Sequence, residues 1–317
     1  MKKQMKYIVL AGWAVVMLAG CSKRTVGEGM GDEEGYPVRF AVGEVTTSKV
    51  LDDDKFEEGD VIGMYAYPQN SSMFATGDEF VRQNVPYVQM SNGELLVEAG
   101  NDPITFPESK KLYFVGYYPY SAEADAAGKV EMDIADQTNG MTGAVLYSDT
   151  WKTKGVSRTF EYVKLEFRYV VAQVVINIKF DPVTMPDGDV GDITSVTFAG
   201  DGLQTGYQFD VQSGGTALLN GGTGTGARGE LDLEPGVSVC KAAVVPNGNI
   251  KNMEFKVTTA DGMTYNAKPN DITYVKGTRY TYNLTLKDSG SAILGDAEIT
   301  DWKPGNDGGT HISGSVQ

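Results

Sequence analysis

The stretch Leu165–Phe180 constrains the fold more than any other part of the chain after the first twenty residues. It is long and apolar, and its many valines and isoleucines fit a pleated sheet that is packed on both faces. A helix would restrict the rotamers of these β-branched side chains. Asp181 and Pro182 end the run, because proline cannot donate a hydrogen bond to a ladder. We therefore predict a buried strand that opens the second of two sandwich-like domains.

The N-terminus has the form of a bacterial lipoprotein leader. Three lysines precede the apolar segment Ile8–Leu18, which is too short to cross a bilayer. Leu18–Cys21 resembles the lipobox, in which the cysteine thiol receives diacylglycerol and becomes the first mature residue. We predict that residues 1–20 are a signal peptide, that the lipid on Cys21 holds the protein to a membrane, and that residues 22–35 form a flexible tether. The alternative is that residues 1–20 are an ordinary signal peptide and that Cys21 is an incidental residue after it.

Charge and cysteine content narrow the choice of partners. The chain has a net charge of −15, and removal of residues 1–20 with their three lysines leaves 24 basic and 42 acidic side chains, or −18. Phosphate backbones would repel such a chain, so we expect no nucleic-acid partner. With Cys21 acylated, the other cysteine, Cys240, has no disulfide partner in the chain, and we expect it to be a small buried strand residue.

The rest of the chain shows many short segments in which apolar and polar residues alternate, and no amphipathic helix of ordinary length. Such strands with frequent turn signals are typical of β-sandwiches. Pro86 interrupts one of them, and we expect an edge strand or a bulge there. The predicted strands are Val38–Val42, Val61–Tyr67, Phe80–Met90, Gly93–Val97, Leu112–Tyr118, Val130–Ile134, Ala144–Tyr147, Ile193–Phe198, Gly206–Val211, Glu230–Leu233, Val237–Val245, Met253–Thr258, Tyr274–Leu286 and Ile293–Trp302.

Motifs for catalysis, cofactors and metals are weak. The sole histidine, His311, argues against catalytic triads and histidine-based zinc sites. Gly224–Gly229 matches a dinucleotide fingerprint, but the following residues alternate like a strand, which indicates a glycine-rich hairpin loop. The acids at 52–54 and at 187, 189 and 192 lack the spacing of a calcium loop. The aromatic cluster Tyr113–Tyr120 is predicted to pack in a core rather than to form a sugar platform. We expect no cofactor and no metal.

Several stretches together resemble the fimbrillin family, which comprises the lipoprotein precursors of type V pili and their fimbrillin-like accessory relatives. The order and spacing of these pieces carry the resemblance, since each alone is only a strand with its turn. Many relatives carry histidine where this chain has Tyr169. The matching pieces are Leu18–Cys21, Phe56–Tyr67, Tyr117–Tyr120, Leu165–Val174, Val275–Leu284 and Ile299–Trp302.

The resemblance implies an all-β fold with two tandem transthyretin-like β-sandwich domains after the lipoprotein signal peptide. We place these domains at 36–163 and 164–317, the second ending in a polar tail. The resemblance also implies transport to the outer membrane as a lipoprotein and a role as a non-enzymatic, surface-exposed subunit of a fimbrium. In this family's assembly scheme, a protease cuts after a basic residue beyond the first strand, and a strand from another fimbrial subunit then replaces the first strand.

On this sequence the exchanged strand would carry Val38, Phe40 and Val42 on one face. The polar run before Lys49 makes that lysine the predicted cleavage site, and Lys55 is the second choice. The family site is commonly arginine. Residues 303–317 offer few apolar side chains for donation, which favours an accessory or tip subunit. The alternative functions are a monomeric glycan-binding surface lipoprotein and a sandwich-fold hydrolase.

Overall fold

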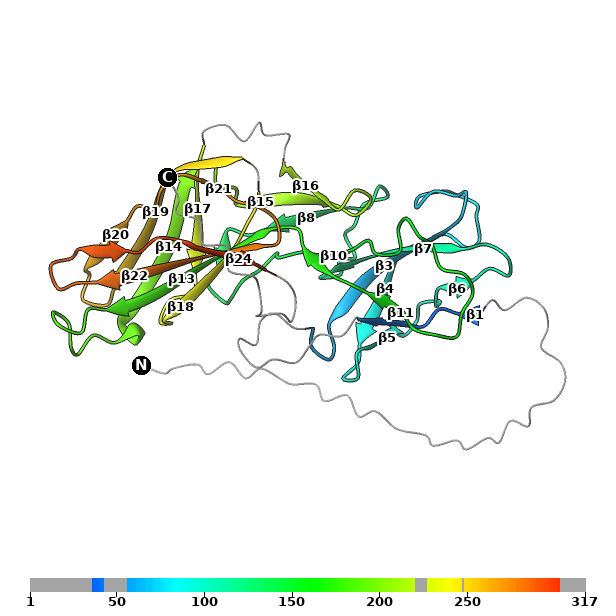
Figure 1. The fold of residues 1–317 in the computed structure, drawn as a ribbon, viewed down its shortest axis with the longest axis horizontal. Coiled ribbons are helices and arrows are strands. Elements are labelled where there is room, and N and C mark those ends of the chain that lie inside the picture. Colours follow the sequence, from blue (N-terminus) through cyan, green and yellow to red (C-terminus); the bar gives the residue numbers. More distant parts are fainter. Residues whose placement is uncertain (1–35, 43–55, 220–226, 247, 303–317) are drawn as a thin grey trace, which may run out of the picture. The chain divides into compact units, whose positions relative to one another are not determined.

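The computed structural model describes residues 36–42, 56–219, 227–246 and 248–302. These residues form strands β1 to β24 and a short 3₁₀ helix, η2 (Val190–Asp192), with no α-helix among them. Consequently, no helix in the described part of the chain is long and apolar enough to span a membrane. The predicted all-β class is confirmed (Figure 1). Cys21, Lys49, Lys55 and His311 lie outside the described residues.

An eight-stranded sheet contains most of the strands formed before residue 170. Its order is β11 (Val163–Leu165), β2 (Phe40–Val42), β5 (Glu94–Val97), β4 (Arg82–Gln89), β3 (Val61–Pro68), β7 (Leu112–Tyr118), β10 (Leu146–Ser148) and β12 (Arg168–Tyr169). Three strands separate β2 from β7 in this sheet, yet the rings of Phe40 on β2 and Phe114 on β7 lie only 5.1 Å apart. This short distance shows that the sheet curls strongly. The rings of Phe40, Tyr87 and Phe114 pack together in the core that this curl encloses.

Two smaller sheets accompany this one. A three-stranded sheet has the order β16 (Gly215–Leu218), β15 (Gly206–Asp210) and β8 (Lys129–Asp133), and a two-stranded sheet joins β1 (Tyr36–Pro37) to β6 (Thr105–Phe106). Phe209 on β15 lies 5.6 Å from Tyr147 and 6.0 Å from Tyr117, measured between ring centroids. The three-stranded sheet therefore packs on the aromatic side chains of the large one.

The remaining strands form two further sheets that share a core. The five-stranded sheet contains β18 (Val239–Val244), β13 (Ala172–Phe180), β22 (Thr278–Leu286), β23 (Ala292–Leu294) and β24 (Glu298–Asp301). The six-stranded sheet contains β20 (Thr264–Ala267), β19 (Asn249–Thr259), β14 (Ile193–Asp201), β17 (Arg228–Leu233), β9 (Asp136–Gln137) and β21 (Ile272–Thr273). Phe255 on β19 meets Tyr282 on β22 with 5.0 Å between ring centroids, so the two sheets pack face to face as a sandwich.

The apolar run Leu165–Phe180 is divided between sheets, which corrects the prediction of one continuous strand. Ala172–Phe180 (β13) is the central buried strand and pairs with β22 in parallel and with β18 in antiparallel fashion. Before Val170 the burial alternates, with Leu165, Phe167 and Tyr169 buried and the polar residues between them exposed. That one-sided pattern suits β11 and β12, which complete the eight-stranded sheet instead.

Strand pairs cross the predicted boundary at residue 163. β8 pairs with β15, β9 pairs in parallel with β17, and β11 pairs in parallel with β2. The described residues accordingly cluster as one compact unit. The boundary itself stays a prediction, but part of each predicted domain completes a sheet of the other.

The last predicted strand, Ile293–Trp302, is present with an interruption. β23 and β24 pair with opposite ends of β22, and their registers differ by one residue, because Leu294 lies opposite Leu284 whereas Glu298 lies opposite Thr281. A one-residue shift is the signature of a bulge. It keeps Leu294, Ala297 and Ile299 packed against the core on both sides of the break.

Candidate functional site: the first strand and its groove

We call the predicted strand Val38–Val42, which contains β2, the first strand. β2 lies inside the eight-stranded sheet, with a neighbouring strand along each side. β2 pairs in antiparallel fashion with β5 and in parallel fashion with β11 (Figure 1). Before β2, the Val38 amide donates a hydrogen bond to the Ile104 carbonyl at 2.8 Å. After it, the Val42 amide donates to the Gly93 carbonyl at 3.0 Å. Removal of this strand would leave unpaired backbone groups on both neighbours.

The predicted inward face of the strand is present. Phe40 is fully buried, Val38 is 5% exposed and Val42 is half-buried. The Phe40 ring stands edge-on to Tyr87 and Phe114, with centroid distances of 5.2 and 5.1 Å. Truncating a buried phenylalanine costs about 3–5 kcal/mol of folding free energy, so Phe40 is the main anchor of the strand.

The outward face is held by Arg39, a contact that the sequence did not predict. Its guanidinium donates hydrogen bonds to the Phe160 carbonyl and the Tyr162 hydroxyl and lies 3.9 Å from the centroid of the Tyr162 ring. It also forms an ion pair with Glu94 at 3.8 Å. The Arg39 carbonyl accepts a hydrogen bond from the Val163 amide at 2.7 Å. Nothing local in the sequence pairs residue 39 with residues 160–163, which lie more than a hundred positions away.

The predicted cleavage sites fall in the segment that follows the strand. Lys49 and Lys55 belong to residues 43–55, between β2 and Phe56. Phe56 is half-buried and contacts the rings of Tyr118 and Phe167 at centroid distances of 5.3 and 4.9 Å. The segment is therefore bounded by two residues packed against the core.

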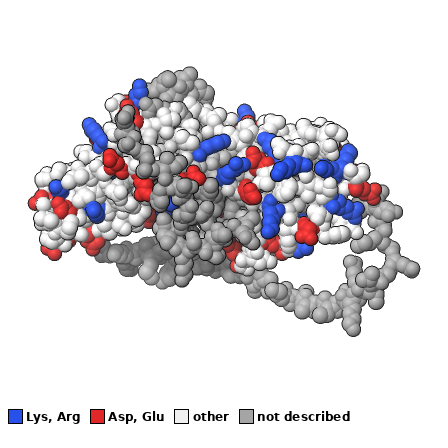
Figure 2. All heavy atoms as spheres, viewed as in Figure 1, with Lys and Arg blue, Asp and Glu red and all other residues white. Residues whose placement is uncertain are grey.

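Acidic residues do not assemble into a metal site in the described ranges, where no group of three or more His, Cys, Asp or Glu side chains is placed to hold an ion. Asp189 caps η2 instead, and its Oδ1 accepts a hydrogen bond from the Gly191 amide at 2.9 Å. Figure 2 shows Asp and Glu side chains among the Lys and Arg side chains that gather over β3, β4, β7 and β11, so this face is not a uniformly basic surface.

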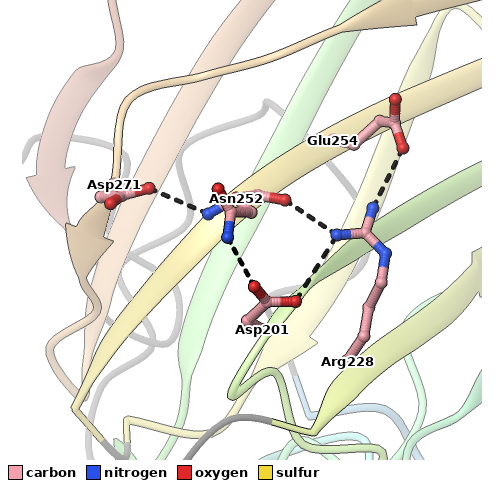
Figure 3. Close-up of polar contacts among 5 residues, drawn as sticks. All are labelled: Asp201, Arg228, Asn252, Glu254 and Asp271. Carbon is pink, nitrogen blue, oxygen red and sulfur yellow. Dashed lines mark hydrogen bonds and ion pairs between the residues drawn. The ribbon is translucent and has the colours of Figure 1, made fainter.

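Figure 3 shows a polar cluster that joins strands of the six-stranded sheet. Arg228 on β17 donates to the Asn252 carbonyl and to Glu254, each at 3.0 Å, and lies 3.8 Å from Asp201. The Asn252 amide nitrogens bond Asp201 and Asp271. All these charges have partners within the cluster, which makes it a structural contact between β14, β17 and β19.

The aromatic cluster at 113–120 packs largely inward, as predicted. Phe114 and Tyr117 are fully buried, and burial raises the pKa of the Tyr117 hydroxyl to about 12. Tyr113 is half-buried and stacks on Tyr67 with 5.4 Å between centroids. A pocket of about 130 Å³ beside the bulge of the last strand, at Lys268, Tyr282 and Asp296, is smaller than the roughly 300 Å³ of typical small-molecule sites.

The glycine-rich fingerprint does not open a helix. Arg228–Leu233 is a strand, β17, which confirms the alternation expected after the glycines. β16 and β17 belong to different sheets, however, so the connection between them is not the predicted hairpin.

Comparison with known proteins decides the family. The fimbrillin-like family model matches residues 46–302, which is most of the chain. The chain belongs to the fimbrillin-like family. No curated protein matches this fimbrillin-like chain in the sequence comparison.

Solved structures that share its fold include the following two. A candidate cell adhesion protein from Bacteroides uniformis aligns with a TM-score of 0.66 and 20% identity, covering 85% of this chain and 99% of the other. A candidate cell adhesion protein from Bacteroides ovatus aligns with a TM-score of 0.64 and 17% identity, covering 85% and 98%.

Proposed function

We propose that this fimbrillin-like chain is a subunit of a surface fimbrium that takes part in adhesion, and that it accepts a strand from another subunit in place of its own first strand. One observation carries the proposal: β2 is paired on both sides and anchored by Phe40, and residues 43–55, which contain the predicted cleavage sites, are its covalent connection to the strands that follow. The family membership and the two cell adhesion proteins of the same fold support the adhesive role. We expect no catalytic activity.

The exchange would take place in the groove that β2 fills, which lies between β5 and β11 and beside the rings of Tyr87 and Phe114. After cleavage at Lys49, the first strand would be held only by noncovalent contacts. Its loss would expose the edges of β5 and β11 and the pocket around Phe40, and an incoming strand would restore both the ladder and the buried apolar surface. Because head-to-tail donation does not close on itself, repeated donation builds a filament.

Processing can be tested by N-terminal sequencing of assembled protein taken from the native surface. We expect the chain to begin at residue 50 after cleavage at Lys49, or at residue 56 if Lys55 is used. Assembled protein that still begins at Cys21 would contradict strand exchange.

Membrane attachment is the second part of the proposal. The lipid on Cys21 would anchor the precursor to the outer membrane after removal of residues 1–20. A Cys21→Ala change or globomycin treatment should block maturation and lower the membrane-bound fraction. A Cys21→Ala protein with normal mature mass and normal membrane association would exclude the lipid anchor.

We further propose an accessory or tip position, in which the subunit accepts a strand and donates none. Residues 303–317 contain only two aliphatic side chains, Ile312 and Val316, whereas a donor fills alternate pockets. Protease-activated protein is to be mixed with full-length protein or with a 1–302 truncation. Polymers that form only with the full-length chain would show that the tail is a donor and would refute the tip position.

A further inference from the structure

We propose that the groove of the first strand selects its incoming strand by an aromatic side chain at the central inward position, preceded by a cation. The occupant is then a segment of a different subunit rather than residues 303–317 of a second copy of this chain. This inference rests on the proposed strand exchange and specifies the partner.

The central position is the deepest of the three inward positions. Phe40 is 0% exposed, and the rings of Tyr87 on β4 and Phe114 on β7 form T-shaped contacts with it at about the same distance. Tyr87 is itself fixed, because its hydroxyl accepts a hydrogen bond from the Ile104 amide at 2.9 Å. A pocket with fixed aromatic walls cannot collapse around a small side chain, so a glycine or alanine there would leave a cavity.

The flanking positions are less demanding. Val42 is only half-buried. Val38 has a small aliphatic side chain, and its backbone amide donates a hydrogen bond to the Ile104 carbonyl. Most aliphatic residues would satisfy these two positions. Discrimination between incoming strands therefore falls on the central one.

The outward position before the aromatic is built for a cation. Arg39 faces four acceptor groups: the Phe160 carbonyl, the Glu94 carboxylate, and the hydroxyl and ring face of Tyr162. A neutral side chain would leave these groups to water. This contact lies on the surface, so its contribution is smaller than that of the buried ring.

Residues 303–317 do not carry this pattern in any register. They contain no Phe, Tyr or Trp. The alternating apolar pair Ile312 and Val316 could match the flanking positions, but Gly314 would then lie in the aromatic pocket and Ser313 at the position of Arg39. A shift by two residues would place Ile312 in the pocket, but Thr310 and Gly314 would then take the flanking positions. No register of that segment therefore places an aromatic ring in the pocket.

Peptide competition can test the selection. The protein would carry a site for a specific protease within residues 43–55, be cut there, and be equilibrated with a fluorescent peptide of residues 36–46 followed by anisotropy. The unlabelled competitors are the native 36–46 peptide, its Phe40→Gly, Arg39→Ser and Ala41→Ser variants, the 303–317 peptide, and that peptide with Gly314→Phe. Ala41 points away from the pocket and serves as the matched control.

We expect Phe40→Gly to weaken competition about 100-fold or more, and Arg39→Ser about fivefold. Ala41→Ser should match the native peptide, and Gly314→Phe should improve the 303–317 peptide at least about tenfold. The selection is overturned if the Phe40→Gly peptide or the unmodified 303–317 peptide competes as well as the native one. If no peptide enters the groove, the native one included, the proposed exchange itself is contradicted and the selection falls with it.

Discussion

The ring of Tyr169 is stacked face to face on the indole of Trp302, with 3.4 Å between centroids and 8° between the planes. Tyr169 ends β12 of the eight-stranded sheet, and Trp302 follows β24 of the five-stranded sheet. The backbone of Gly277 connects the two segments through hydrogen bonds: its amide donates to the Val171 carbonyl and its carbonyl accepts from the Trp302 amide, each at 2.8 Å. The stack thus ties the last described residue to the segment where the chain leaves the first sheet.

Replacement of Trp302 should therefore destabilise the whole fold. Trp302 is 1% exposed, and a Trp302→Ala change should lower the free energy of unfolding by about 3–5 kcal/mol. Trp302→Phe retains a ring against Tyr169 and should cost clearly less. Urea denaturation followed by circular dichroism measures both changes. Equal losses for alanine and phenylalanine would show that the stack itself contributes nothing.

Asn252 should tolerate glycine better than alanine. Its φ of 49° lies in the left-handed region, which costs most L-residues about 1–2 kcal/mol and glycine almost nothing. Both substitutions remove the side-chain bond to Asp201 shown in Figure 3, so the difference between them isolates the backbone strain. We expect Asn252→Gly to be the more stable protein by about 1 kcal/mol in thermal or urea unfolding. A more stable Asn252→Ala protein would contradict this.

Cys240 should be inert in the native protein. Its side chain is buried, its thiol donates to the Glu234 carbonyl at 3.2 Å, and burial raises its pKa to about 12. Iodoacetamide should therefore label it at pH 8 only after unfolding in urea. Because the thiol ionises more readily in the unfolded chain, its contribution to stability should fall as the pH rises from 9 toward 12, and Cys240→Ala should remove that part of the loss. Rapid labelling of native protein would show that the site is open.

The predicted boundary at residue 163 can be tested with the fragments 36–163 and 164–317. We expect each fragment to be β-rich but less cooperative than residues 36–317, because β8, β9 and β11 pair across the cut. Mixing the fragments should restore the native melting transition. Two separate native-like transitions without mixing would instead show that the halves fold independently.

The sequence predicted strands well where burial is one-sided. Alternation is exact in β8, where Val130 and Met132 are buried between exposed neighbours, and this strand was identified almost to its ends. Alternation does not say which strand lies beside which. Pro86 was expected at an edge or a bulge, yet it lies in β4 between β3 and β5, opposite Gly63. The register of β3 and β4 shifts between Met64 and Ala66, so an irregularity does lie nearby.

The sequence identified the residues of the first strand, but not the long-range contacts that hold it in the sheet. Val38, Phe40 and Val42 alternate visibly in the sequence, whereas the contact of Arg39 with Tyr162 depends on the parallel pairing of β2 with β11. Gln137 gives a similar case, since its buried side-chain amide bonds the backbone of Ala243, and no local pattern announces a polar residue in a core. Such long-range contacts follow from topology, which periodicity alone does not determine.

The proposed departure and replacement of the first strand can be tested by locking the strand in place. Ala41 lies opposite Glu94 in the antiparallel pair, and the Val42 to Gly93 hydrogen bond makes that pair a non-hydrogen-bonded one, in which side chains come closest. Ala41→Cys with Glu94→Cys, in a Cys21→Ser background, should therefore form a disulfide on the outward face without disturbing Phe40.

The measurement is native mass spectrometry of this protein, cut within residues 43–55 and incubated with a tagged 36–46 peptide, in the oxidised and reduced forms. We expect the reduced protein to lose its own first strand and take up the peptide, and the oxidised protein to keep its strand and take up none. Equal uptake by both forms, or no uptake by the reduced form, would contradict strand exchange.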